Sequence, residues 1–364
     1  MYSESDIDAA VEAGALSREA AAAFRAHVAV ARAIPAVDEE SFRLLTGFND
    51  IFVSIAAVLM LVAMGWLGNM IRLFAPEPGP SPFIGFAIAA AAWGLAEYFT
   101  RERRMALPSI ILLLAFAGGL FAGFAILLGT IFDVDNGQPE RLVAMIVATA
   151  AALTAGGVWL HWRRFQVPIT VAAGTAAMAA LSLALVVAAV PAIGGHLFKL
   201  LLIAGLAVFA LAMWWDISDR TRTTRRSDVA FWLHLLAAPM IVHPIFAMMG
   251  MLSGSAAPAK AAFVILIYIA LGIIALAIDR RALMVSALAY VLYALSSLIE
   301  QSGAVDLGFG LTALIIGSAL LLLSAFWTVA RRHIVGLLPE DIALRLPVVD
   351  PSRRPLDRLG GSSG

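Results

Sequence analysis

Apolar residues fill long stretches of the chain, and short polar segments separate them. The stretches cover residues 51–73, 82–99, 106–132, 142–160, 167–189, 197–215, 229–252, 259–278, 282–299 and 305–329. An α-helix needs about 20 consecutive apolar residues to cross the roughly 30 Å hydrocarbon core of a bilayer. The pattern therefore predicts an all-α fold, a polytopic transmembrane helical bundle with about ten spans.

The composition agrees with a membrane protein and excludes several kinds of chemistry. Of the 364 residues, 62% are hydrophobic and 14% are charged, against about 45–50% and about 25% in soluble domains. The chain has no cysteine, which excludes disulfides, thiolate metal ligands and cysteine nucleophiles. Its 25 basic and 25 acidic residues balance, so no net charge favours nucleic acid as a partner.

Basic residues are distributed unequally between the two sides of the predicted bundle. The loops after the second, fourth, sixth and eighth stretches carry Arg101, Arg103, Arg104, Arg163, Arg164, Arg220, Arg222, Arg225, Arg226, Arg280 and Arg281. The opposite loops carry Arg72, Arg141, Lys199 and Lys260. Because short cytoplasmic loops are enriched in arginine and lysine, this asymmetry predicts that both termini face the cytoplasm.

The two ends of the chain are more polar than its middle and predict separate segments. Residues 1–46 are expected to form a cytoplasmic helical segment, and residues 47–330 the transmembrane domain. Residues 331–359 form a cytoplasmic or interfacial tail, in which apolar residues at helical spacing lie beside arginines. Such a tail suits a helix on an anionic leaflet or one packed against the loops. Residues 360–364 have the composition of an artificial linker.

The first segment contains the pattern VEAGALSREA at residues 11–20, in which Ser17 can cap a helix over 17–34. This pattern, followed by a series of membrane spans, resembles the N-terminal element of a broad family of bacterial multi-spanning membrane proteins of unassigned function. The segments WGLAE at 93–97 and FWLHLLAAP at 231–239 are similar to parts of proteobacterial membrane proteins. The resemblance implies the bacterial inner (plasma) membrane, and it implies no catalytic residues.

Four predicted hairpins share one pattern around the arginine-rich loops: an apolar helix ends in a polar residue, arginines follow, and the next helix begins. This favours tandem two-helix repeats in the central eight spans, although the usual enrichment of arginine and tryptophan at membrane interfaces predicts much of the same pattern. Small residues at 119–123 predict a tight helix crossing. Interfacial polar pairs are expected between Glu97 and Arg101, Asp216 and Arg220, and Asp279 and Arg280.

Ionisable residues at membrane depth mark candidate functional sites, because burying them is costly. The stretch 229–252 carries His234 and His243 together with Pro239 and Pro244. Proline removes a backbone donor and opposes a regular helix, so we expect a broken span, as in transporters that expose backbone carbonyls to cargo. His243 is a candidate proton relay or, equally, a partner of a carbonyl that the kink frees.

A second group of polar residues lies on the ninth stretch. Tyr293 and Glu300 belong to a stripe at helical spacing that lines an outer approach or joins helices by hydrogen bonds. With His243 and His234 they form the candidate substrate or proton pathway. On an unbroken helix, nine residues rotate by about 900° and the two histidines face opposite ways, so they could share a metal only if the proline break re-aims one of them, and no metal site is assigned. The sequence carries no cofactor signature.

Three functions fit these features. The first is a transporter or proton-linked permease for an unknown small substrate. The second is a non-transporting sensor or assembly platform that binds a cytoplasmic protein partner through residues 1–46. The third is a lipid-modifying enzyme with His234 as base, although no nucleophile or metal signature accompanies it and no catalytic residue is assigned.

The expected partners are the bilayer, with anionic lipids in its inner leaflet, and, as a further option, other copies of the chain in a homo-oligomer. A cavity at His243 would favour transport, whereas loss of function on deleting residues 1–44 would favour the platform.

Overall fold

The structure is a computed structural model and describes residues 10–14, 16–24, 48–74, 79–134, 139–220, 222, 224–250, 258–301 and 308–347. These residues form helices, turns and loops and contain no strand, so the predicted all-α fold is confirmed. The chain divides into two compact units. The first unit comprises Met1–Phe42 and Val348–Gly364, and the second comprises Arg43–Pro347.

In the first unit, residues 10–12 and 18–24 are helical. Ser17 Oγ accepts a hydrogen bond from the backbone N–H of Ala20 at 3.1 Å, which satisfies one of the free donors at the start of the second helical segment. The predicted cap at Ser17 is therefore confirmed. The part of the predicted helix after residue 24 lies outside the described residues.

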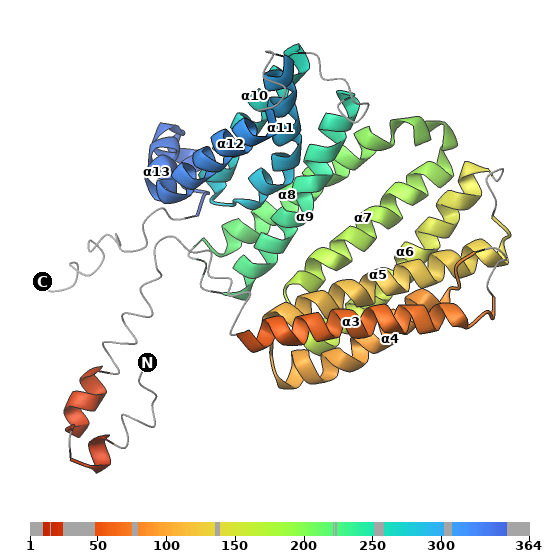
Figure 1. The fold of residues 1–364 in the computed structure, drawn as a ribbon, viewed down its shortest axis with the longest axis horizontal. Helices are drawn as coiled ribbons and strands as arrows, with labels where there is room; N and C mark the ends of the chain where they lie inside the picture. Colours follow the sequence, from red (N-terminus) through yellow and green to blue (C-terminus); the bar gives the residue numbers. More distant parts are fainter. Residues whose placement is uncertain are drawn as a thin grey trace, which may run out of the picture. The chain divides into compact units, whose positions relative to one another are not determined.

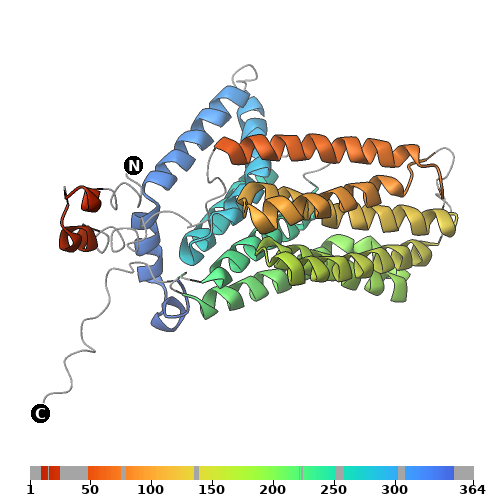
Figure 2. The same ribbon diagram turned by 90° about the horizontal axis from the view of Figure 1, so that it is seen from below.

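The second unit is a bundle of helices that run back and forth along the chain (Figure 1 and Figure 2). Its elements are α3 (Phe48–Met70), α4 (Phe83–Ala96), the π-helical η1 (Glu97–Glu102), α5 (Ala106–Ile131), α6 (Glu140–Phe165), α7 (Ile169–Ala189), the 3-10 helix η2 (Pro191–His196), α8 (Leu197–Ser218), α9 (Arg225–Met248), α10 (Pro258–Ile278), α11 (Ala282–Gln301), α12 (Gly308–Ala325), α13 (Trp327–Leu337) and α14 (Glu340–Ala343). The predicted apolar stretches fall on α3 to α12 in chain order.

Within the described part of the chain, 7 helices are long and apolar enough to cross a membrane. They are α3, α4 with η1, α5, α6, α7, η2 with α8, and α9. α12 and α13 together pass the same test as one span with a bend of 76°, and α10 and α11 are apolar over 262–278 and 283–296. Large apolar side chains such as Trp66 and Leu321 are 70% and 73% exposed, which suits contact with lipid. The chain thus has the helices of an integral membrane protein.

Four hairpins are packed extensively, which are α4 with α5, α6 with α7, α8 with α9, and α10 with α11, and α3 packs against α4 to the same extent as α10 against α11. Glycines let α4 and α5 approach closely. A methyl group on Gly85 would lie 2.3 Å from both the carbonyl oxygen of Gly119 and the backbone nitrogen of Gly123, which confirms the predicted tight crossing. The hairpins that share a sequence pattern are thus each packed helix pairs, and their origin by duplication stays a prediction.

α9 is the most buried of the candidate spans among the described helices. It contacts α7, α8 and α11, and its Val242 and Phe246 join a core cluster with residues of α10 and α11. The helix runs through Pro239 and Pro244 without interruption, so the predicted break of this span is wrong. Each proline removes only its own backbone donor, and the neighbouring helices stabilise the span around it.

α13 and α14 close one end of the second unit. α13 begins at Trp327 directly after the bend that separates it from α12. Trp327 and Leu346 are buried in a cluster with Leu276 and Leu283, which flank the turn between α10 and α11. The segment 327–347 therefore packs in part against the bundle, while Leu337 is 85% exposed.

Candidate functional site

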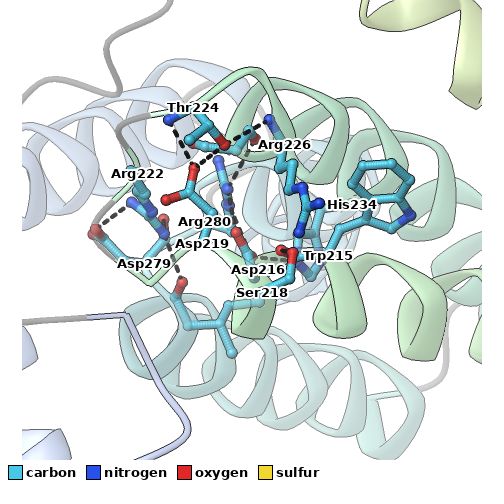
Figure 3. A network of polar contacts seen from close by, with 12 residues as sticks. Trp215, Asp216, Ser218, Asp219, Arg222, Thr224, Arg226, His234, Asp279 and Arg280 are labelled. Atoms are coloured by element: carbon cyan, nitrogen blue, oxygen red, sulfur yellow. Dashed lines mark hydrogen bonds and ion pairs between the residues drawn. The ribbon is translucent and has the colours of Figure 1, made fainter.

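A buried cluster of Asp216, His234 and Arg280 lies near the turn between α8 and α9 (Figure 3). Arg280 donates to Asp216 through Nε to Oδ2 at 3.2 Å and through Nη2 to Oδ1 at 2.5 Å. His234 Nε2 lies 2.9 Å from Asp216 Oδ2. The exposed fractions are 1% for Asp216, 0% for His234 and 2% for Arg280. The cluster therefore joins three separate segments of the chain and is sealed from solvent.

The backbone after α10 directs Arg280 toward this cluster. Asp279 has φ +58°, a left-handed conformation that aspartate tolerates better than most residues. The N–H of Arg280 donates to the Ala275 carbonyl at 2.9 Å, and that of Asp279 to the Leu276 carbonyl at 3.3 Å. These two hydrogen bonds form a Schellman motif, which ends α10 and turns the chain sharply. As a result, the Arg280 side chain reaches Asp216 near the end of α8.

The Asp279 side chain extends the polar network from the buried cluster to α13. Arg222 Nη1 donates to its Oδ2 at 2.6 Å, and Trp327 Nε1 donates to its Oδ1 at 2.7 Å. Arg331 Nη1 lies 3.8 Å from Oδ2. Burial alone would raise the pKa of Asp279, but the positive charges of Arg222 and Arg331 outweigh it and hold the pKa below its ordinary value of 3.8. Asp279 is therefore ionised at neutral pH and binds α13 to the α10–α11 turn.

Two arginines hold the segment that follows α14. Arg331 Nη2 donates to the carbonyl oxygen of Pro347 at 2.7 Å. Arg220 Nε, from the turn between α8 and α9, donates to the carbonyl oxygen of Leu346 at 3.0 Å. We call the buried cluster, together with Asp279 and these arginine contacts, the ionic clamp. It connects the turns of two hairpins to the tail of the second unit.

The chemistry of the buried cluster follows from its burial. A histidine beside a carboxylate is the arrangement of a general base and the group that orients it. Here, however, both side chains are sealed in this conformation, and Nδ1 of His234 is buried with no hydrogen-bond partner. Removing one partner of a buried ion pair leaves an uncompensated charge and is strongly destabilising. The cluster is therefore suited to holding α8, α9 and the α10–α11 turn in one arrangement.

A similar acid–arginine pair bridges the first two hairpins. Arg164, at the end of α6, donates to the two carboxylate oxygens of Glu97 at 2.8 Å each. The two residues are 67 positions apart, and Asp216 and Arg280 are 64 apart. Arg101 also lies 3.4 Å from Glu97, as local spacing predicts. Unlike the buried cluster, Arg164 and Glu97 are 39% and 33% exposed. In the described residues, acid–arginine contacts thus bridge successive hairpins in both halves of the bundle, Glu97 with Arg164 in the first and Asp216 with Arg280 and Asp279 with Arg222 in the second.

Two other acid–arginine pairings differ from those that local spacing suggests. Asp216 contacts Arg280 rather than Arg220, whose guanidinium bonds the tail. Asp279 contacts Arg222 rather than the adjacent Arg280. The near-equal separations of 64 and 67 residues are the sequence signal that could have identified the long-range bridges.

Of the predicted substrate or proton pathway, His234 and His243 lie in separate contacts. His243 Nδ1 lies 2.5 Å from the hydroxyl of Tyr290, whereas His234 belongs to the buried cluster. On the continuous α9, nine residues place the two histidines on opposite faces and about 13 Å apart along the axis. Tyr293 is 41% exposed, and the side chain of Glu300 lies outside the described residues.

The fold and the site together define a class, a multi-pass α-helical membrane protein with an ionic clamp at one end of its bundle. Comparison of the chain with protein-family models, with curated proteins and with solved structures found no match. The resemblance to bacterial multi-spanning membrane proteins therefore stays a prediction.

Proposed function

We propose that the chain is a non-transporting membrane platform that presents a cytoplasmic surface of fixed shape to a protein partner. The observation that carries this proposal is the ionic clamp. Its central residues, Asp216, His234 and Arg280, are at most 2% exposed and come from three segments. Because separating buried partners costs several kcal/mol, the clamp favours a single arrangement of α8 to α11 and α13.

The central helix supports the same function. Transporters move one group of helices against another around a site that broken helices often form. α9 is continuous through its prolines and is the most buried candidate span of the described residues. It also provides His234, which contacts Asp216 of α8 and, through this carboxylate, is linked to Arg280 of the next hairpin. A platform requires a central helix that keeps its position, whereas a transporter with alternating access requires central helices that change their arrangement.

The proposal assigns the ionic clamp to the cytoplasmic side of a bacterial inner membrane. The excess of arginine in the hairpin loops supports this orientation through the positive-inside rule. Both termini then lie on the same side as the clamp. Residues 1–46 are the proposed contact with the protein partner.

A flux assay on the full chain tests whether the protein transports. The purified chain is reconstituted into liposomes loaded with a pH-sensitive dye, and a membrane potential drives proton movement. We expect the proton flux into liposomes that contain the chain to equal the flux into liposomes without protein. A flux above that level that disappears in His243→Ala would overturn the platform.

Complementation in cells tests the contact with a partner. A strain without the gene receives the full chain, a variant lacking residues 1–44, or His243→Ala, each at a verified level in the membrane. We expect the deletion alone to lose function, because it removes the proposed contact and leaves the spans intact. Normal function of the deletion variant would contradict the platform.

A proton-linked permease is the second candidate, and one observation favours it. Half-buried His243 lies 2.5 Å from the Tyr290 hydroxyl and so links α9 with α11 by two groups that can exchange protons. For this function, the flux assay would give a proton current in the full chain that both His243→Ala and Tyr290→Phe reduce.

A further inference from the structure

A small apolar pocket lies between α10, α11, α12 and the first residue of α13. Its volume is about 170 Å³, below the roughly 300–1,000 Å³ of pockets that enclose compact small molecules. Met284, Leu288, Leu320 and Leu323 form much of its wall. The size and the wall suit a segment of a flexible hydrocarbon chain.

The pocket is accessible from the outer, apolar surface of the bundle. Val285 lines the pocket and is 65% exposed. Leu321 and Leu322, next to pocket residues on α12, are 73% and 60% exposed. In a membrane protein, exposed apolar side chains of this size face lipid. The molecules that meet this pocket are therefore membrane lipids.

Polar groups of the pocket match the polar part of a phospholipid. Arg281 and Ser324 line it, and the guanidinium carbon of Arg281 lies 4.7 Å from the ring centroid of Trp327. Tryptophan and arginine favour the headgroup level of a membrane. Tyr268 also lines the pocket, and its hydroxyl is buried without a hydrogen-bond partner. Because an unsatisfied buried hydroxyl is costly, a ligand oxygen at this position would be stabilising.

We propose that this pocket binds an anionic phospholipid. The phosphate contacts Arg281 and Ser324, an ester oxygen accepts from the Tyr268 hydroxyl, and part of one acyl chain fills the apolar wall. A guanidinium forms strong charge-assisted hydrogen bonds with phosphate. Basic pockets between membrane helices are known to select anionic headgroups. This site goes beyond the proposed function and does not depend on a protein partner.

Lipid binding to the full chain tests the proposal. Native mass spectrometry of the chain in detergent compares phosphatidylglycerol with phosphatidylcholine of identical acyl chains. We expect phosphatidylglycerol to bind at least about fivefold more tightly, the value of one arginine near a headgroup. Arg281→Gln should abolish this preference. Arg226→Gln is the matched control, because Arg226 is exposed at the start of α9 and should leave the preference unchanged.

Two further variants keep the test decisive if Arg281→Gln does not fold. Val285→Trp enlarges an exposed residue at the pocket, so it should fold and weaken the binding of both lipids. Tyr268→Phe removes the unsatisfied hydroxyl, so it should raise the melting temperature of the lipid-free chain and reduce the further rise on adding phosphatidylglycerol. Equal affinity for the two lipids, or wild-type affinity of Val285→Trp for phosphatidylglycerol, would overturn the proposal.

Discussion

Arg280→Met should reveal how much the buried cluster stabilises the fold. The substitution keeps an apolar side chain of similar length but leaves the Asp216 carboxylate at 1% exposure with His234 as its other partner. Breaking a buried ion pair costs about 3–5 kcal/mol, because the remaining charge lacks both water and its counter-ion. We expect the free energy of unfolding to fall by an amount in this range. Adding Asp216→Asn removes that charge, so the double variant should recover most of the loss.

Arg164→Met is the matched control for this experiment. Arg164 holds Glu97 by two hydrogen bonds of 2.8 Å, but the two side chains are 39% and 33% exposed. Water solvates Glu97 after the substitution, so the loss should be much smaller than at the buried cluster. The free energies are measured by reversible unfolding of the full chain in detergent, followed by circular dichroism. A loss for Arg280→Met no larger than for Arg164→Met would refute the reasoning that burial makes the cluster a clamp.

Three other changes test separate parts of the structure by the same unfolding measurement. The folded-state pKa of Asp279 lies below its ordinary value of 3.8, so as the pH falls this carboxyl takes up a proton in the unfolded chain before it does so in the folded chain. The stabilisation that the ionised Asp279 gives to the fold is complete above about pH 4 and is lost as the pH falls through the folded-state pKa. Asp279→Asn should flatten this pH dependence of the free energy of unfolding. Gly119→Ala should destabilise by about 1–3 kcal/mol, because the methyl group would lie 2.6 Å from a carbonyl oxygen of α4. Gly118→Ala, with nothing within 4 Å, should be neutral or stabilise by up to about 1 kcal/mol, and equal losses at the two glycines would contradict the tight crossing. Tyr290→Phe removes the hydrogen bond to His243 and should cost about 1 kcal/mol; an unchanged free energy of unfolding would contradict a stabilising contact.

Hydropathy predicts the helices of this chain because a bilayer requires a minimum apolar length for each crossing. The stretches 51–73 and 106–132 agree closely with α3 (Phe48–Met70) and α5 (Ala106–Ile131). The same rule gives no information on the direction of side chains. Hydropathy therefore predicts the helices of the bundle and the positions of the polar loops between them, but not which side chains contact one another at the ends of the helices.

The contacts of the acids depend on turns that local spacing ignores. Four residues bring Asp216 and Arg220 to one face only if the helix continues, but α8 ends at Ser218. The left-handed conformation of Asp279 then brings Arg280 to Asp216 from another hairpin. Long-range contacts of this kind follow from the tertiary arrangement of the hairpins, which spacing within one helix does not describe.

The prolines of α9 show a second limit of local reasoning. Pro239 and Pro244 disfavour a helix in isolation, which predicts a break beside His243. In the bundle, α7, α8 and α11 pack around α9, and the helix stays continuous. Packing around a central span outweighs the local preference of its prolines.

The order of residues in the buried cluster also has a consequence during synthesis. His234 follows Asp216 by 18 residues, and Arg280 follows it by 64. At about 5–20 residues per second, the ribosome makes His234 roughly 1–4 s after Asp216 and Arg280 roughly 3–13 s after it. Of the two partners, the imidazole of His234 is thus synthesised first and can contact the Asp216 carboxylate before Arg280 is present. Loss of this histidine would consequently lower the yield of correctly inserted chains, even where the finished protein tolerates the change.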